Sequence, residues 1–219
     1  MFEIDNIIRE NIRSLTPYSS ARNEFKGNEG VLLDANENPF NEPYNRYPDP
    51  LQWDVKEKLA SLKGVKPGQI FLGNGSDEAI DLLIRAFCEP HRDNIISIHP
   101  SYGMYQVAAD INAVDFVKVS LNADFTLNVD AVKKAVNRNT RLMMLCSPNN
   151  PTANSFKASD MLGLAKGYNG LVVVDEAYID FSSQPSLLSS LVECENLVIL
   201  QTFSKAWGLA GLRLGIAFA

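Results

Sequence analysis

The sequence predicts an α/β domain of three layers (α/β/α), in which helices cover both faces of a mainly parallel sheet of seven strands. Three observations indicate this fold. Short apolar runs recur along the chain, amphipathic segments alternate with them, and 46% of the 219 residues are hydrophobic. Apolar strands that alternate with amphipathic helices are typical of parallel sheets joined by crossover helices. The length suits one large domain with appendages.

The first 50 residues are expected to form an N-terminal arm. Isoleucines at helical spacing in residues 1–13 predict a short helix there. The rest of the arm is expected to be irregular, because prolines interrupt regular structure at Pro17, Pro39, Pro43, Pro48 and Pro50. We therefore divide the chain into an arm, residues 1–50, and a large domain, residues 51–219.

The large domain is expected to contain all seven strands, at residues 70–72, 94–98, 116–119, 142–146, 171–174, 197–201 and 213–218. Helices are expected at residues 51–63, 77–87, 129–136 and 159–166, after Pro100, and in a shorter form near residues 187–192. A tight turn is expected at residues 73–76. Ligands of such sheets collect beyond the carboxyl ends of the strands, and the polar motifs described below follow strands.

Composition limits the possible partners. The formal net charge of −6 provides no general field for binding nucleic acid or an anionic membrane. No apolar run approaches the roughly 18 residues of a membrane span. The three cysteines, Cys88, Cys146 and Cys194, are far apart, and this spacing suggests a reducing compartment. We expect a cytoplasmic protein, with Cys88 and Cys146 in the core.

Five short motifs follow one another along the chain. They are Gly-Asn-Gly-Ser-Asp at residues 73–77, Pro-Ser-Tyr at 100–102, Ser-Pro-Asn-Asn-Pro-Thr at 147–152, Asp-Glu-Ala-Tyr at 175–178, and Thr-Phe-Ser-Lys at 202–205 with Gly-Leu-Arg at 211–213. Each has a plainer explanation when taken alone. Asp175 could cap a helix, Lys205 could be a solvated surface lysine, Tyr102 could be a packing residue, and the asparagine–proline segment could be a turn.

In this order the motifs resemble the class II aminotransferases of fold type I, which use pyridoxal 5′-phosphate (PLP), and most closely those that act on histidinol phosphate. The resemblance extends from Tyr18 to Arg213, and its most specific part is Thr-Phe-Ser-Lys-Ala-Trp-Gly-Leu-Ala-Gly-Leu-Arg at residues 202–213. It implies a transamination in histidine biosynthesis. Histidinol phosphate donates its amino group to 2-oxoglutarate, or, in the other direction, glutamate donates it to imidazole-acetol phosphate. The last strand is then the antiparallel member of the sheet.

The resemblance also implies roles for individual residues. Lys205 is expected to hold PLP as a Schiff base and later to move a proton between the substrate Cα and the cofactor. Asp175 is expected to pair with the pyridinium nitrogen. Tyr178 and Asn150 are expected to hydrogen-bond the phenolic oxygen, and Tyr102 is expected to stack on the ring. The phosphate is expected to contact Arg213, Thr202, Ser204 and the backbone amides of Ser76 and Asp77.

The arm contributes three further residues by resemblance. Asn-Glu-Asn-Pro at residues 36–39 and Tyr-Pro-Asp-Pro at 47–50 match early motifs of the family. Tyr47 is expected to reach the cofactor phosphate of a partner subunit, which makes the active unit a homodimer. Tyr18 and Asn36 match substrate-side positions. Loop packing is the plainer explanation of all three.

The sequence departs from the family pattern at two places. Ala153 stands where a glycine usually follows Asn-Pro-Thr, and an alanine is mildly unfavourable if the turn needs a positive φ. The chain also ends at Ala219, before the small C-terminal domain that supplies an arginine for the acid end of the substrate. We therefore expect a chain without this domain that binds PLP but transaminates poorly.

The motifs are also compatible with other functions. The chain could be another enzyme of fold type I, such as an aromatic aminotransferase or a threonine-phosphate decarboxylase, or a non-catalytic PLP-binding fragment. A dinucleotide site of the Gly-x-Gly-x-x-Gly type is excluded, because Glu78 occupies the last position. No Gly-x-Ser-x-Gly segment of a serine hydrolase is present.

Overall fold

The computed structural model describes residues 2–19, 31, 33, 35–40 and 43–219. The chain divides into two compact units. One contains the residues up to Arg13 together with Gln69–Ala219, and the other is Ser14–Gly68. The second unit contains α3 (Trp53–Lys63) and most of the predicted arm. Among the described residues, no helix combines the length and the apolar character needed to cross a membrane.

The amino-terminal segment differs from the expectation of a single short helix. It contains a 3-10 turn, η1 (Ile4–Asn6), and one separate helical turn, α1 (Glu10–Arg13). Between them the N–H of Arg9 donates to the carbonyl oxygen of Ala86 at 2.9 Å, and Ile7 is buried in the core of the large unit. The expectation of one helix is wrong because these contacts with α4 replace the hydrogen bonds that a continuous helix needs.

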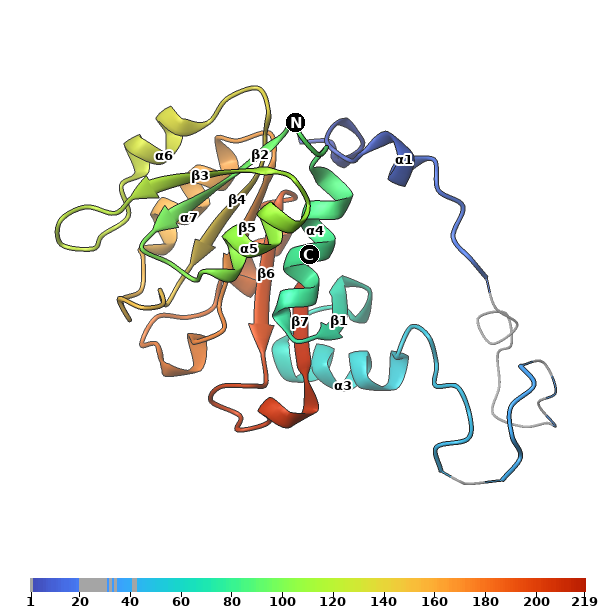
Figure 1. Ribbon diagram of the computed structural model, residues 1–219. Coiled ribbons are helices and arrows are strands. Elements are labelled where there is room, and N and C mark those ends of the chain that lie inside the picture. Colours follow the sequence, from blue (N-terminus) through green and yellow to red (C-terminus); the bar gives the residue numbers. More distant parts are fainter. Residues whose placement is uncertain (1, 20–30, 32, 34, 41–42) are drawn as a thin grey trace. The chain divides into compact units, whose positions relative to one another are not determined.

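The seven expected strands are confirmed and form one sheet in the order β1-β7-β6-β5-β4-β2-β3. Their bounds are β1 (Ile70–Asn74), β2 (Asn94–His99), β3 (Asp115–Ser120), β4 (Thr140–Cys146), β5 (Leu171–Asp175), β6 (Leu197–Thr202) and β7 (Leu214–Phe218). All neighbours from β6 to β3 pair in parallel. β7 is antiparallel to both β1 and β6, so the sheet is mainly parallel, as predicted (Figure 1).

The expected turn at residues 73–76 is wrong in its extent. β1 continues through Gly73 and Asn74, which pair with Gly215 and Leu214 of β7. The change of direction is confined to Gly75, whose φ of 76° favours glycine. Local sequence could not indicate this, because the extra strand residues depend on pairing with a distant strand.

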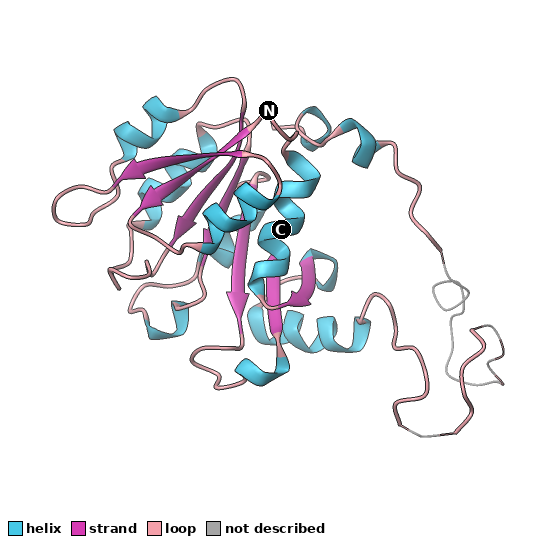
Figure 2. Ribbon diagram, in the orientation of Figure 1, coloured by secondary structure: helices cyan, strands magenta, loops and turns pink. Residues whose placement is uncertain are grey.

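The remaining helices lie close to the expected positions. They are α4 (Ser76–Phe87), α5 (Met104–Ile111), α6 (Val129–Ala135) and α7 (Ala158–Lys166). The segment Leu187–Val192 is a 3-10 helix, η4, rather than an α-helix, and η2 (Pro67–Gln69), η3 (Ile179–Phe181) and η5 (Ala210–Leu212) are short turns of the same kind. Figure 2 shows these helices around the strands.

Alternation along the strands separates the two faces of the sheet. Leu142, Met144 and Cys146 of β4 share one buried cluster with residues of α4 and α5. The intervening residues Met143 and Leu145 are also buried and point to the opposite face, where α6 and α7 lie (Figure 1). Both faces are therefore covered by helices, and the predicted three-layer arrangement is confirmed.

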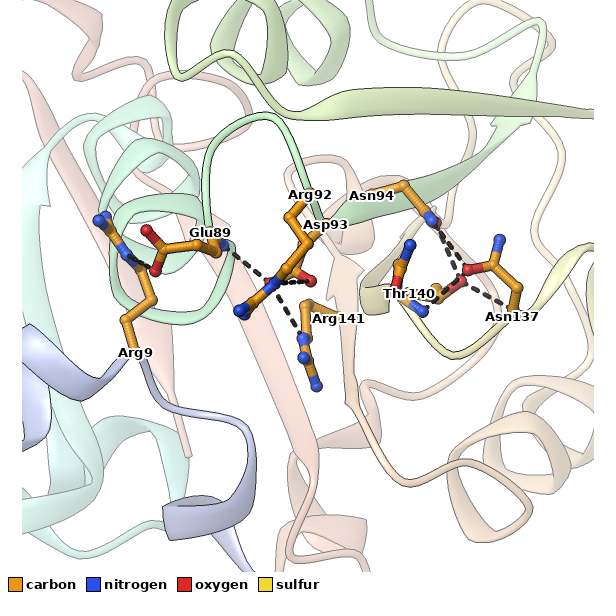
Figure 3. A network of polar contacts seen from close by, with 9 residues as sticks. Arg9, Glu89, Arg92, Asp93, Asn94, Asn137, Thr140 and Arg141 are labelled. Atoms are coloured by element: carbon orange, nitrogen blue, oxygen red, sulfur yellow. Dashed lines mark hydrogen bonds and ion pairs between the residues drawn. The ribbon is translucent and has the colours of Figure 1, made fainter.

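A polar network lies at the amino ends of β2 and β4 (Figure 3). Most of the motifs follow the carboxyl ends of parallel strands, at the opposite edge of the sheet. The buried carboxylate of Asp93 accepts hydrogen bonds from Arg92 Nε at 3.2 Å, Arg141 Nε at 3.1 Å and the N–H of Glu89 at 2.9 Å. Burial acts to raise the pKa of Asp93, but these donors outweigh it and the pKa is lowered. Arg9 Nε contacts Glu89 Oε2 at 3.1 Å, which links the amino-terminal segment to the same network.

Candidate functional site

A cavity of about 180 Å³ lies where β4, β5 and β6 end and α4 begins. It brings together all the cofactor residues predicted outside the arm, namely Ser76, Asp77, Tyr102, Asn150, Asp175, Tyr178, Thr202, Ser204, Lys205 and Arg213. Gly75, Cys146 and Ala177 complete its lining. The motifs that follow separate strands thus converge on one place.

Sheet topology explains this convergence. β4, β5 and β6 are parallel neighbours, so the loops that follow them leave the sheet at the same edge. β7 runs antiparallel to β6 and therefore starts at this edge, with Gly215 paired to Thr202. β1 is antiparallel to β7 and ends there, with Asn74 paired to Leu214. The amino end of α4 and Arg213, which precedes β7, consequently meet at the cavity.

One end of the cavity is suited to an anion. The first-turn N–H groups of α4 have no partners within the helix and carry a partial positive charge. Gly75 and Gly215 allow a close approach, because a Cβ on Gly215 would overlap the backbone of Gly75 and Ser76, and one on Gly75 would lie 2.6 Å from Arg213 Nη2. The guanidinium of Arg213 therefore lies beside the amino end of α4. This combination of backbone amides and a forked cation is typical of phosphate sites.

Two hydroxyl groups extend this end of the cavity. Thr202 Oγ1 donates to Ser204 Oγ at 3.0 Å, and the N–H of Ser204 donates to Thr202 Oγ1 at 3.1 Å. Thr202 is the last residue of β6, and Ser204 lies in the loop that follows it; both line the cavity. Both side chains can reorient their hydroxyl protons toward an anion.

Asp175 forms the opposite, acidic part of the site. It is the last residue of β5, is 2% exposed, and lies between Cys146 of β4 and Leu200 of β6 in the sheet. Its Oδ2 accepts from the hydroxyl of Tyr105 at 2.7 Å and its Oδ1 from the N–H of Ala177 at 3.0 Å. Burial raises the pKa of Asp175 although both hydrogen bonds act to lower it. A cationic partner in the cavity would favour the ionised carboxylate.

The neighbouring acidic residue Glu176 points away from the cavity, as strand alternation requires. It is also buried, and it accepts hydrogen bonds from Gln201 Nε2 at 2.9 Å and the N–H of Leu187 at 2.8 Å. Glu176 therefore fastens the start of η4 to the sheet. Of the two consecutive acids, only Asp175 can serve a ligand in the cavity.

Lys205 lies on the loop that follows β6. The loop is anchored by Phe203, which is buried and packs on Trp207 with ring centroids 4.9 Å apart. Lys205 is exposed, and its Nζ lies 5.4 Å from the ring centroid of Tyr178. The amino group of Lys205 therefore borders the cavity and is accessible to a ligand.

Tyr102 forms a side wall. Its hydroxyl donates to Asp77 Oδ1 at 3.2 Å, and burial together with the charge of Asp77 raises the pKa of Tyr102 to about 12. The ring of Tyr105 meets that of Tyr102 edge to face, with centroids 5.5 Å apart and an interplanar angle of 86°. Tyr105 was not among the predicted site residues, because a tyrosine within an amphipathic helix resembles ordinary core.

The two consecutive asparagines, Asn149 and Asn150, have different surroundings. Asn149 is buried, and its Nδ2 donates to the carbonyl oxygen of Pro100 at 3.0 Å and to Thr152 Oγ1 at 2.7 Å. It joins two loops, while Asn150 lines the cavity. The turn that follows does require a positive φ, since Ala153 has a φ of 62°.

The three predicted arm residues do not line the cavity. Tyr18, Asn36 and Tyr47 belong to the unit Ser14–Gly68. Tyr18 and Tyr47 are exposed, and the N–H of Tyr47 donates to Glu37 Oε1 at 2.7 Å. Their roles toward substrate and partner subunit stay predictions.

Comparison with known proteins agrees with this arrangement. Residues 22–219 match the family described as aminotransferase class I and II. Histidinol-phosphate aminotransferases of Parabacteroides distasonis and Flavobacterium johnsoniae are 58% and 56% identical to the chain; both alignments cover 100% of it. The chain spans 64% and 63% of the length of these two relatives.

A solved structure is also similar. It is the histidinol-phosphate aminotransferase of Sinorhizobium meliloti in complex with pyridoxal-5′-phosphate, which matches with a TM-score of 0.73 at 27% identity. The match covers 80% of this chain and 48% of that one. All residues that line the cavity fall within the part of the chain that matches the family. The chain therefore belongs to the family of class I and II aminotransferases.

Proposed function

We propose that this chain forms the PLP-binding part of an aminotransferase that transfers the amino group between histidinol phosphate and 2-oxoglutarate, in histidine biosynthesis. One observation carries the proposal: the amine of Lys205, the buried carboxylate of Asp175 and the anion end at Arg213 all border one cavity. The names of the similar proteins support the choice of substrate.

The donor set fits PLP in each of its parts. The amino end of α4, Arg213 and the nearby hydroxyls suit the phosphate, and Gly215 lets β7 pack closely against the start of α4. Asp175 suits a protonated ring nitrogen, since a buried carboxylate prefers a cationic partner. Tyr102 offers an aromatic face for the ring. Tyr178 supplies a hydrogen-bonding group for the phenolic oxygen.

PLP, when bound, supplies a ring that accepts electrons from the substrate Cα. Lys205 would hold the cofactor through its Nζ and would serve as the base that moves the substrate Cα proton. Asp175 would keep a ring nitrogen protonated. Asn150 and Tyr178 would hydrogen-bond the phenolic oxygen, and Arg213 would hold the phosphate.

Three finer points belong to the same proposal. The active unit is a homodimer in which Tyr47 reaches the cofactor phosphate of the partner subunit, and Tyr18 and Asn36 face the substrate. Residues 1–50 form an N-terminal arm, and residues 51–219 form the PLP-binding large domain. The protein works in the cytoplasm, and its three unpaired cysteines support a reducing compartment.

Uptake of PLP by the chain tests the proposal. We expect a visible absorbance band on addition of PLP that is resistant to dialysis, is absent in Lys205→Ala, and is retained in the control Lys133→Ala, whose side chain is exposed on α6. Transfer from histidinol phosphate to 2-oxoglutarate, compared with phenylalanine and threonine phosphate, then tests the substrate. A wild-type chain that takes up no PLP, or a band that survives in Lys205→Ala, contradicts the proposal.

A further inference from the structure

Tyr105 occupies an unusual position behind the site. It lies in α5, its exposed fraction is 0%, and it is not part of the cavity lining. Its hydroxyl nevertheless donates to Asp175 Oδ2 at 2.7 Å, and its ring packs edge to face on Tyr102. One buried side chain therefore contacts two walls of the cavity that come from different elements.

The hydrogen bond has a fixed direction. Burial and the charge of Asp175 raise the pKa of Tyr105 well above its usual value, so the phenol keeps its proton and remains a donor. Among the described residues, Tyr105 is the one side chain that donates a hydrogen bond to Asp175, and the other donor is the backbone N–H of Ala177. These two donors hold one oxygen each, and this fixes the plane of the carboxylate.

Other groups around Asp175 act through charge or proximity. Asp77 at the start of α4 raises the pKa of Asp175, and Lys205 after β6 lowers it. Cys146 at the end of β4 is buried beside both Asp175 and Tyr105, and burial raises the pKa of its thiol to about 12. The thiol of Cys146 is therefore neutral at neutral pH, and the charge of Asp77 opposes ionisation of Asp175. Among the described residues, the Tyr105 hydroxyl is the side-chain donor whose hydrogen bond favours the charged form of Asp175.

We propose that Tyr105 is a positioning residue, whose hydroxyl fixes the carboxylate of Asp175 while its ring supports Tyr102, so that the cavity is preorganised for a flat, cationic aromatic ring. This inference rests on the proposed function. Tyr105 acts through its two neighbours and does not itself touch the ligand. Loss of the hydroxyl removes one of two donors from a buried carboxylate, which weakens its charged form.

The variant Tyr105→Phe tests the role of the hydroxyl and keeps the ring. Its matched control is Tyr168→Phe, because the hydroxyl of Tyr168 is also buried but has no hydrogen-bond partner among the described residues. Tyr168 precedes the first residue of β5, whereas Asp175 is the last residue of that strand. Two measurements are made on the 219-residue chain. One is the titration of the Asp175 carboxyl by carbon NMR without cofactor, and the other is the dissociation constant of PLP by absorbance.

We expect Tyr105→Phe to raise the pKa of Asp175 and to weaken PLP binding about tenfold, in line with the loss of one hydrogen bond to a charged group. Tyr168→Phe should change neither quantity. The effect of Tyr105→Phe on PLP binding should also disappear in the Asp175→Asn background, because the hydroxyl acts through that carboxylate.

The outcomes separate this inference from the function on which it rests. If wild type binds PLP while Tyr105→Phe leaves both the Asp175 titration and PLP binding unchanged, the positioning role is wrong and the proposed function stands. If Tyr105→Phe weakens binding equally in the Asp175→Asn background, its effect is general packing and the inference also fails. If wild type takes up no PLP, the proposed function fails whatever the variants do.

Discussion

The N–H of Gly75 donates a hydrogen bond of 2.8 Å to the carbonyl oxygen of Arg213. This bond joins the turn before α4 to the residue before β7, two segments that are far apart in the chain. Both residues have a positive φ, 76° for Gly75 and 54° for Arg213. The backbone geometry at this point therefore places a helix amino end and a guanidinium group side by side, which is what an anion requires.

Gly75→Ala should damage this arrangement. The added Cβ would lie 2.6 Å from Arg213 Nη2, at a backbone φ that disfavours side chains. We expect a loss of about 1–2 kcal/mol in the free energy of unfolding, and weaker PLP binding because the guanidinium must move. Urea denaturation and absorbance titration measure the two effects. The control Gly163→Ala, in α7 with open space around the Cβ, should stabilise the chain by about 0.5–1 kcal/mol. Equal behaviour of the two variants would contradict the argument.

Ala153→Gly should stabilise the chain. Ala153 holds a φ of 62°, a conformation that costs an alanine about 1–2 kcal/mol and a glycine little. Part of this gain is offset by the greater freedom of glycine in the unfolded chain. We expect a net gain of about 0.5–1 kcal/mol in the free energy of unfolding by urea denaturation. PLP binding should stay as in wild type, since Ala153 does not line the cavity. A destabilised variant would show that the turn has another conformation.

Asp93→Asn should lower the free energy of unfolding without changing PLP affinity. Asp93 is buried and accepts from Arg92, Arg141 and the N–H of Glu89, and these contacts lower its pKa. A lowered pKa contributes stability that is present above the unfolded pKa and is lost as the pH falls through the folded pKa. We expect a loss of about 2 kcal/mol at neutral pH that shrinks in acid, measured by urea denaturation at several pH values. PLP affinity should be unchanged, because the network (Figure 3) lies at the amino ends of β2 and β4, whereas the cavity lies at the carboxyl ends of β4, β5 and β6.

Asp175→Asn should give the opposite pH dependence in the chain without cofactor. Burial raises the pKa of Asp175, so this carboxyl contributes stability that is fully present below the unfolded pKa and is lost as the pH rises through the folded pKa. Wild type should therefore lose stability relative to Asp175→Asn as the pH is raised above the unfolded pKa of about 4. Urea denaturation of both chains measures the difference. A difference that grows with pH in favour of wild type would mean that Asp175 is stabilised as a carboxylate even without a ligand.

Most elements of the fold are predictable from local patterns. Apolar runs indicated all seven strands, and helical spacing indicated α4, α6 and α7 within a few residues, because these segments bury a face whose period is visible in the sequence. The motif order likewise indicated Lys205, Asp175 and Arg213 as members of one site. Their roles rest on resemblance, since neighbourhood alone assigns no chemistry.

The seven strands and the helices α4, α6 and α7 are visible in the sequence, because burial patterns are local properties of the chain. The residues that line the cavity were indicated by motifs that resemble those of a family. Other features depend on the tertiary structure. The segment before Arg13 forms no single helix because it bonds to α4, and β1 extends to Asn74 because β7 pairs with it. Tyr105 joins the site because the register that sets Asp175 beside Cys146 also turns its carboxylate toward α5. These features depend on contacts between distant segments, which exist only once the chain has folded.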